Sequence, residues 1–283
     1  MPTSTESLDK AGEPTLRLLT RMDLPEAFRL SSLEGWNQTV ADWHLLLAMS
    51  PENCFCVEKE GAVVATTTLV PYEDRLGWIG MVLTDPSCRR RGLAERLLRH
   101  VLGRAAVLGI KTLKLDATQQ GRPLYSKLGF VAEQTIERWV RPGNGSVPRV
   151  GLSCDREWIA TWAEHDRAAF GADRSLVLKA LLGQSRIFCN ESAYLFTRAG
   201  RTSAYLGPCV SRDLQSARDL LGAITASHNT SWSWDVLSGN ANAMRLASEM
   251  GFSSQRCLLR MRRGRPTSEK DEQVYAIAGF EFG

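Results

Sequence analysis

Apolar positions in the first half of the chain fall into short segments with the spacing of strands. Residues 15–20 alternate between apolar and polar, and residues 54–57 and 62–71 are rich in β-branched side chains, with a polar turn between them. Residues 78–84 (WIGMVLT) form a nearly continuous apolar run, which predicts a central strand covered on both faces. Two more strands are expected, at residues 112–117 and 130–140.

Helices are expected between these strands. Asp23 and Pro25 predict the start of a short helix, because a carboxylate can cap free N–H groups and proline suits a first turn. Further helices are predicted at residues 41–49 and 124–128. After the central strand, apolar side chains recur at helical spacing, at Leu93, Leu97, Leu98, Val101, Leu102 and Ala105. The order of elements predicts a mixed α/β (α+β) fold with helices on the faces of the sheet.

The pattern of strands and helices starts again in the second half of the chain. Helices are expected at residues 156–168, 174–182, 211–226 and 240–250. Strands are expected at residues 186–189, 193–198, 202–209, 232–237, 252–263 and 273–283. Trp232 and Trp234 lie two apart on one strand and are expected in the core.

One sequence match indicates an internal duplication. LYSKLGF at residues 124–130 and LASEMGF at residues 246–252 share Leu, Ser, Gly and Phe at matching places. We therefore expect two tandem domains of one type. The predicted division is a disordered tail at 1–14, a first domain at 15–141, a proline- and glycine-rich linker at 142–151 and a second domain at 152–283.

The composition of the chain excludes only a few classes of function. The chain has 283 residues, and its net charge of +4 permits an anionic ligand without demanding nucleic acid. No apolar run resembles a secretory signal or a membrane span, so a cytoplasmic protein is expected, with no membrane partner. The seven cysteines and four histidines are scattered. They predict reduced core thiols and no metal site.

The segment CRRRGLAERLL contains the strongest candidate chemistry. Taken alone, three consecutive arginines are typical of a solvated surface or a nucleic-acid contact. Here they precede a predicted helix, whose free N–H groups and dipole favour an anion. Gly92 and Ala94 are small enough to let a pyrophosphate approach the backbone. The context therefore favours an anion site.

With its flanking elements this segment resembles the acyl-CoA motif of the GNAT superfamily of N-acyltransferases. The resemblance rests on a strand ending in Val82-Leu83-Thr84, on Arg89-x-x-Gly-x-Ala opening a helix, on the strand TLKLDA, and on Tyr125-x-x-x-Gly-Phe. It covers residues 15–141, and the second half looks like the diverged extra domain of two-domain members. The implied co-substrate is acetyl-CoA.

The resemblance implies roles for particular residues. Val82, Leu83 and Thr84 would hold pantetheine through their backbone. Tyr125 would face the thioester sulfur as general acid, although an isolated tyrosine of this kind is by default a core residue. The pyrophosphate would lie against Arg89, Arg90, Arg91, Gly92, Leu93, Ala94 and Glu95. Thr118 stands where many members have asparagine, and is the remaining candidate for cofactor contact.

The implied reaction is direct attack of a primary amine on the acetyl group. A central-strand N–H would stabilise the oxyanion, and a carboxylate would accept the proton. The candidates for this base are Glu34, Asp42, Glu73 and Asp74, and the sequence does not choose among them. Trp36 either lines the acceptor pocket or packs in the core.

The acceptor is left open between small molecules and peptides, and a homodimer is possible. A non-catalytic acyl-CoA sensor is the alternative function. A nucleic-acid binder is disfavoured, because no interleaved aromatic and basic surface is present. The second half is expected to lack cofactor, because Ala247 aligns with Tyr125 and Asp213 stands where a carboxylate can cap the matching helix. Its expected role is to shape the acceptor cleft, the surface between the domains or an oligomer.

Overall fold

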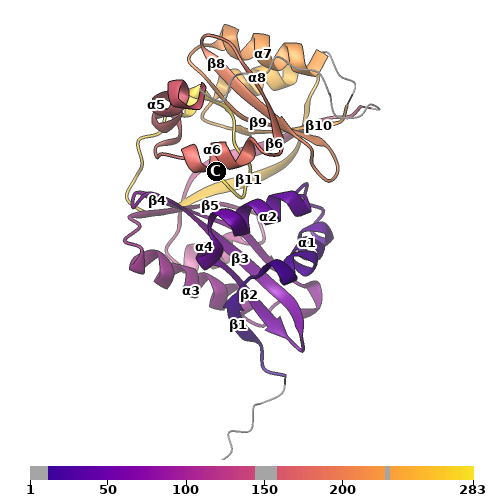
Figure 1. The fold of residues 1–283 in the computed structure, drawn as a ribbon, viewed down its shortest axis with the longest axis vertical. Helices are drawn as coiled ribbons and strands as arrows, with labels where there is room; N and C mark the ends of the chain where they lie inside the picture. Colours follow the sequence, from indigo (N-terminus) through magenta and orange to yellow (C-terminus); the bar gives the residue numbers. More distant parts are fainter. Residues whose placement is uncertain (1–11, 144–157, 227–229) are drawn as a thin grey trace, which may run out of the picture.

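A computed structural model describes residues 12–143, 158–226 and 230–283 of the chain (Figure 1). The predicted tail at 1–14 and linker at 142–151 lie mostly outside these described residues. The mixed fold of strands and helices is confirmed. No helix of the described residues is long and apolar enough to cross a membrane.

The elements follow the predicted order closely. The helices are α1 (Leu24–Leu33), α2 (Val40–Met49), α3 (Leu93–Val107), α4 (Arg122–Lys127), α5 (Trp158–Phe170), α6 (Ser175–Leu181), α7 (Leu214–Ala226) and α8 (Ala241–Glu249). The strands are β1 (Thr15–Leu18), β2 (Cys54–Lys59), β3 (Ala62–Tyr72), β4 (Leu76–Thr84), β5 (Thr112–Ala117), β6 (Val131–Arg141), β7 (Ser185–Cys189), β8 (Ala193–Arg198), β9 (Ala204–Ser211), β10 (Trp232–Leu237), β11 (Ser253–Gly264) and β12 (Val274–Ala276).

Three local predictions were wrong. Only residues 274–276 of the expected last strand are extended in the sheet. Asp23 stands at the N-cap of α1 without capping it, because its carboxylate instead accepts hydrogen bonds from Arg17 and from Thr20. Cys189 is disulfide-bonded, whereas reduced thiols were expected throughout.

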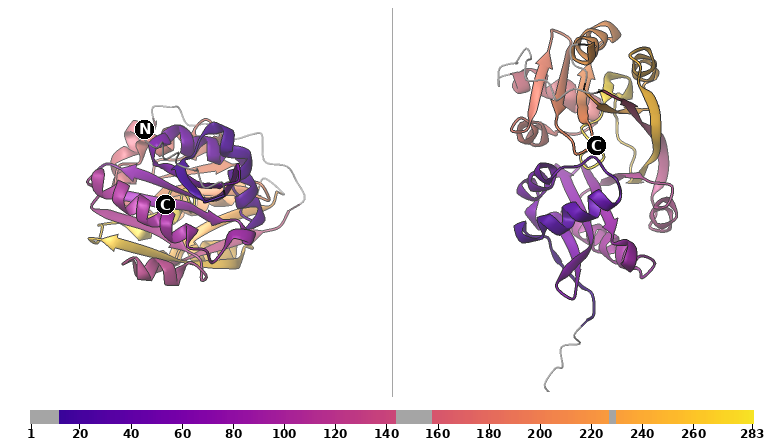
Figure 2. Two further views of the ribbon diagram at one scale, coloured as in Figure 1. Left: turned by 90° about the horizontal axis from the view of Figure 1, so that it is seen from below. Right: turned by 90° about the vertical axis from the view of Figure 1, so that its right-hand side faces the viewer.

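One sheet runs through both halves of the molecule, in the order β1-β2-β3-β4-β5-β11-β6-β10-β9-β8-β7, with β12 paired to β9. The halves exchange strands at its centre: β6 of the first half pairs with β10, and β11 of the second half pairs with β5 (Figures 1 and 2). The division into domains at 15–141 and 152–283 therefore stays a prediction about the sequence, and the sheet itself does not divide there.

The duplicated segments occupy equivalent places in the two halves. Gly129 and Gly251 both adopt the left-handed conformation after a helix, with φ of 85° and 80°. In both copies the next residue, Phe130 or Phe252, donates its backbone N–H 3.0 Å to the carbonyl at the Tyr125 or Ala247 position. The same turn thus starts each of the two exchanged strands.

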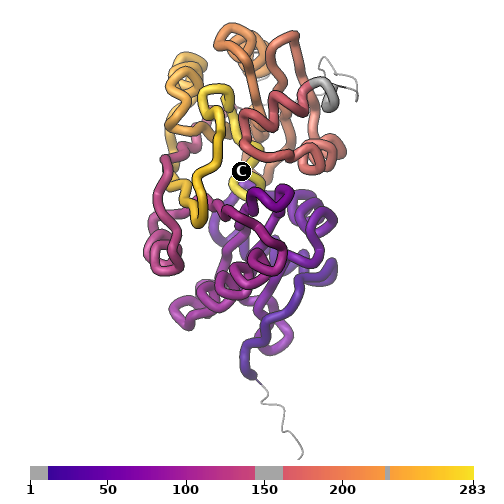
Figure 3. Tube along the Cα trace, turned by 90° about the vertical axis from the view of Figure 1, so that its left-hand side faces the viewer, coloured from indigo at the N-terminus to yellow at the C-terminus, as the bar shows by residue number. Residues whose placement is uncertain are grey.

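A shared core holds the halves together. Its buried side chains come from α1, α2, β4, α5, α6, β8 and the end of the chain, and include Trp43, Trp78, Tyr194 and Phe282. Figure 3 shows the yellow end of the chain lying between the two halves. There the indole of Trp78 donates to the Phe280 carbonyl at 2.9 Å, and the Tyr72 hydroxyl donates to the Phe282 carbonyl at 2.6 Å.

The strands β4 and β5 separate shortly after they begin. They pair in parallel only where Leu76–Trp78 lies beside Thr112–Lys114. Beyond this point a register shift against β3 and a positive φ of 50° at Met81 mark a bulge in β4. Among the described residues, the β5-facing backbone edge of residues 79–84 consequently has no strand partner.

Candidate functional site

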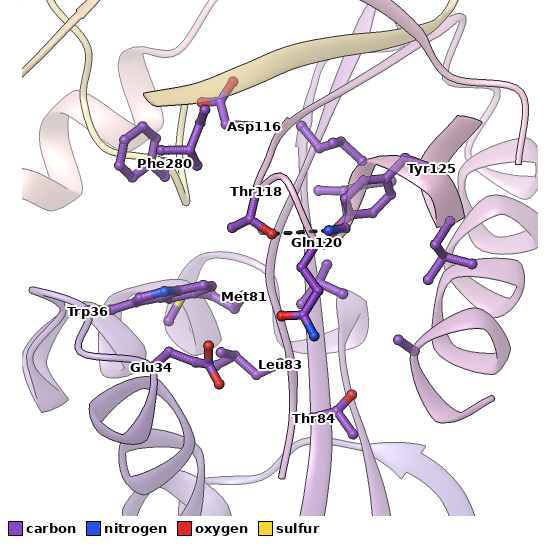
Figure 4. A pocket seen from close by; sticks show the side chains of 18 of the residues that line it. Glu34, Trp36, Met81, Leu83, Thr84, Asp116, Thr118, Gln120, Tyr125 and Phe280 are labelled. Atoms are coloured by element: carbon purple, nitrogen blue, oxygen red, sulfur yellow. Dashed lines mark hydrogen bonds between the residues drawn. The ribbon is translucent and has the colours of Figure 1, made fainter. Parts of the chain in front are cut away.

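A cavity of about 590 Å³ opens where β4 and β5 separate (Figure 4). Its walls come from both halves of the chain. The first half contributes Glu34, Trp36, Gln38, Ile79, Gly80, Met81, Val82, Leu83, Thr84, Cys88, Arg89, Arg90, Gly92, Leu93, Ala94, Glu95, Leu115, Asp116, Thr118, Gln120, Gly121, Leu124, Tyr125 and Arg138. The second half contributes Arg256, Leu258, Phe280 and Glu281.

One end of the cavity is the start of α3. Gly92 is the N-cap residue with φ of 76°, and no side chain caps the helix. A Cβ at Gly92 would find nothing within 4 Å, so the backbone is open to a ligand there. Unpaired N–H groups and the helix dipole at such a start favour an anion.

The three arginines before this helix are not equivalent. Arg90 lines the cavity and has a positive φ of 61°. Arg89 also lines the cavity, but its guanidinium is ion-paired with Glu34 and donates to the Thr84 carbonyl at 3.3 Å. Arg91 is exposed and does not line the cavity, unlike the other residues predicted to contact cofactor.

Tyr125 lines the cavity from α4, across from Trp36 and Phe280 (Figure 4). The side chain is buried, and its ring packs so closely over Gly121 that a Cβ there would come within 2.8 Å of the ring. Burial raises the pKa of the phenol well above its usual value, so the hydroxyl stays protonated at neutral pH. Within the described residues, no group hydrogen-bonds this hydroxyl.

Thr118 also lines the cavity, at the turn before α4. Its hydroxyl oxygen accepts from the Gly121 N–H at 3.2 Å, which Figure 4 marks with a dashed line. This bond occupies one acceptor site of the oxygen and leaves its proton available to a ligand.

The other end of the cavity is built around charges from both halves. Arg138 on β6 forms a two-pronged pair with Asp235, at 2.8 and 2.6 Å. Glu281 accepts from the Gln38 amide at 2.8 Å and lies 3.4 Å from Arg198. Burial is the largest effect on Glu281 and raises the pKa of its carboxyl, against the opposing charge of Arg198.

Of the four carboxylates predicted as candidate bases, only Glu34 lines the cavity. Asp42 is buried at the start of α2, where it completes a capping box with Thr39. The remaining two, Glu73 and Asp74, are paired with Arg167 and Lys111 at the surface. These three do not line the cavity.

Sequence reasoning missed the residues that the second half adds to the cavity, above all Arg256 and Glu281. Both lie far along the chain from the recognised motif. The end of the chain reaches the cavity because the Glu281 backbone packs against Gly80 of β4, where a Cβ would come within 3.0 Å of it. A glycine inside a strand can signal such a close approach of another backbone.

The matching place in the second half is closed. The Asp213 carboxylate accepts from the Ser216 N–H at 2.8 Å, which confirms the predicted capping of α7. The strand β12 pairs with β9 where β9 and β10 separate. From there the Ile277 N–H reaches the Asp235 carbonyl of β10 at 3.2 Å. The chain itself thus fills the gap that stays open between β4 and β5.

Comparisons with known proteins match both halves. A family model described as acetyltransferase (GNAT) family matches residues 20–130, and one described as acetyltransferase (GNAT) domain matches residues 163–276. The uncharacterized N-acetyltransferase YitH of Bacillus subtilis is 26% identical over 189 residues, which are 63% of this chain and 66% of that protein.

Solved structures share the fold over nearly the whole chain. A Pyrococcus horikoshii protein, provisionally described as an acetyltransferase, superposes with a TM-score of 0.83 at 22% identity, covering 100% of this chain and 99% of that one. A GCN5-related N-acetyltransferase from Sphaerobacter thermophilus reaches 0.62 at 13% identity, covering 91% and 98%. The likeness in fold therefore extends across both halves.

Proposed function

Because the chain belongs to the GNAT superfamily of acyltransferases, with two such domains in tandem, we propose that it transfers an acetyl group from acetyl-CoA to a primary amine. The observation that carries the proposal is the cavity between β4 and β5, which joins an anion-binding helix start to a buried tyrosine. The matching gap in the second half is filled by β12, so the proposal assigns one catalytic site to each chain.

The cavity fits acetyl-CoA in two respects. The open backbone at Gly92 suits a pyrophosphate, with Arg90 adding countercharge. The free edge of β4 at Val82, Leu83 and Thr84 suits the amide-bearing arm of pantetheine, which can pair with a strand edge. Bound acetyl-CoA supplies an acyl group that is activated as a thioester.

Direct transfer is supported by the single, continuous cavity. Gly92, Tyr125 and Glu281 all line this one cavity, so both substrates can be held in one place. Holding two reactants in a productive orientation removes much of the entropic barrier. The free N–H groups of β4 face the same space and can stabilise negative charge on the acyl oxygen.

Tyr125 is assigned as the general acid. Its phenol is protonated at neutral pH, lines the cavity and has no competing hydrogen bond within the described residues. These are the properties needed to donate a proton to a departing thiolate. The position and the protonation state of this side chain support the proposed role.

Glu281 is assigned as the general base that accepts a proton from the amine. Glu34 is tied to Arg89, and Asp116 is paired with Arg260 at 2.9 and 3.1 Å. Glu281 also lines the cavity, and its contact with Arg198 is longer, at 3.4 Å. Burial raises the pKa of its carboxyl, which makes the ionised form a stronger base. The second half of the chain thereby contributes to catalysis in the first.

Turnover of acetyl-CoA tests the proposal. Purified protein is incubated with acetyl-CoA and a panel of primary amines, and released thiol and acetylated product are both quantified. We expect stoichiometric release of thiol and formation of an N-acetyl product with at least one class of amine. Tight binding of acetyl-CoA without transfer to any amine would instead identify the alternative, an acyl-CoA sensor.

A further inference from the structure

One arginine at the charged end of the cavity lacks a carboxylate partner among the residues that the structure describes. Arg256 on β11 lines the cavity and is half-buried, yet it makes no hydrogen bond or ion pair with any residue that the structure describes. The other buried arginines of this region are all paired: Arg138 with Asp235, Arg260 with Asp116, and Arg198 with Glu281. Arg256 therefore presents a guanidinium to the cavity without a carboxylate bonded to it, although the negative charges of Asp235 and Glu34 act on it from nearby.

The local backbone places the Arg256 side chain close to a second arginine. A bulge in β11 between Ser254 and Arg256 sets Arg256 directly opposite Arg138 on β6. Like charges directly opposite each other on neighbouring strands are destabilising. Burial and the charge of Arg138 both lower the pKa of Arg256. The two neighbouring guanidinium groups destabilise the free protein, and a bound anion would reduce their repulsion.

The guanidinium is held in place by an aromatic ring. The Arg256 Cζ atom lies 5.9 Å from the centre of the Trp36 ring, within the range of a cation–π contact. Trp36 itself faces the cavity beside Met81 and Glu34 (Figure 4). Contact through one face leaves the N–H groups at the edge of the guanidinium free to bind a carboxylate through two parallel bonds.

A second unsatisfied group lies in the wall of the same cavity, at an atom buried below its surface. The Gln38 side chain is 6% exposed, and its Oε1 atom has no hydrogen-bond partner, although its amide nitrogen binds Glu281. A buried acceptor without a donor is costly unless a ligand supplies one. An ammonium or amine N–H is such a donor, and Glu281 adds negative charge beside it.

We propose that the acceptor is an amine that also carries a carboxylate, with the carboxylate bound by Arg256 and the amine by Gln38 and Glu281. This inference rests on the proposed function and names its substrate class. The two ends of an amino-carboxylate match the two unsatisfied groups. Its carboxylate is an anion for Arg256, and its amine is a hydrogen-bond donor for Gln38. An amine without a carboxylate would leave Arg256 unpaired.

Matched pairs of acceptors test the proposal. Acetyl transfer is compared for amino acids and the amines that lack only their carboxylate, such as tyrosine with tyramine and lysine with cadaverine. We expect kcat/KM to be about 10- to 100-fold higher for the preferred amino-carboxylate than for its partner. In Arg256→Gln this advantage should disappear, through a higher KM for the amino-carboxylate and little change for the simple amine.

Arg263→Gln is the matched control, because Arg263 is exposed on the same strand and does not line the cavity. It should keep the wild-type preference. Equal use of both members of every pair, or an Arg256→Gln variant that loses activity equally toward both, would overturn the carboxylate site while leaving acetyl transfer intact.

A binding measurement separates this outcome from failure of the proposed function. Thermal melting of the protein saturated with CoA is followed as each member of a pair is added. Amino-carboxylates should raise the Tm of the wild type and not of Arg256→Gln, whether or not transfer occurs. No rise in Tm with any amino-carboxylate would also overturn the site.

Discussion

At the scale of single residues, burial favours the opposite roles that we propose for two groups of one cavity. It raises the pKa of the Tyr125 phenol, which keeps a proton available, and it raises the pKa of the Glu281 carboxyl, which strengthens its ionised form as a base. Pairs of titratable groups whose environments suit them to donate and to accept are typical of acid–base sites.

Tyr125→Phe tests the acid. The change keeps the ring, which packs on Gly121, and removes only the proton. We expect kcat to fall by about 10²–10⁴-fold, with little change in the KM for acetyl-CoA, as measured by steady-state thiol release. Tyr275→Phe, the same change in the buried core of the second half, should leave kcat unaltered. A wild-type kcat in Tyr125→Phe, with chemistry rate-limiting, would remove Tyr125 from the mechanism.

Glu281→Gln tests the base. Since the pKa of Glu281 is raised, the active carboxylate form is present above that pKa and is lost as pH falls through it. The acid limb of the kcat/KM profile should therefore lie above about pH 4.3, the ordinary value for glutamate. In Glu281→Gln this limb should disappear and the rate should drop. Glu34→Gln should retain the limb, and a limb that persists in Glu281→Gln would point to another base.

At the scale of elements, one helix start and one strand edge create the proposed cofactor end of the cavity. Helix α3 was predicted closely because its buried face repeats at helical spacing, and Gly92 and Gly109 take left-handed conformations at its two ends, with φ of 76° and 70°. Only the first of these glycines lines the cavity. Substitutions at the two glycines should therefore cause similar backbone strain, and only a substitution at Gly92 should also disturb ligand binding.

Gly92→Glu places bulk and negative charge at the anion site, and any side chain there is strained by the positive φ. We expect loss of CoA binding with the fold retained, judged by calorimetry and circular dichroism. Gly109→Glu carries the same strain at the far end of α3, also with nothing within 4 Å, and should bind CoA normally. Equal binding by both variants would move the cofactor site away from α3.

At the scale of the whole molecule, the exchange of β6 and β11 was not predictable from the sequence. Local spacing indicates which residues form strands, but it carries no information about pairing between residues more than 100 positions apart, such as Arg260 with Asp116. For the same reason the motif located Gly92 and Tyr125, while Arg256 and Glu281 were missed. The duplication was readable because its two copies retain the same glycine turn.

The arrangement of the whole molecule accounts for the difference in function that we propose between the two halves. The chain fills the gap between β9 and β10 with β12, and the segment that follows carries Phe280 and Glu281 into the cavity of the first half. One half has become part of the wall of the other half's site. The account therefore assigns a single cofactor site to two domains of one ancestry.

Calorimetric titration of acetyl-CoA into the purified wild-type chain tests this central claim most directly. The account predicts one binding site per chain, with all of the heat of binding abolished by Gly92→Glu. Two equivalent sites per chain, or binding that survives in Gly92→Glu, would contradict it.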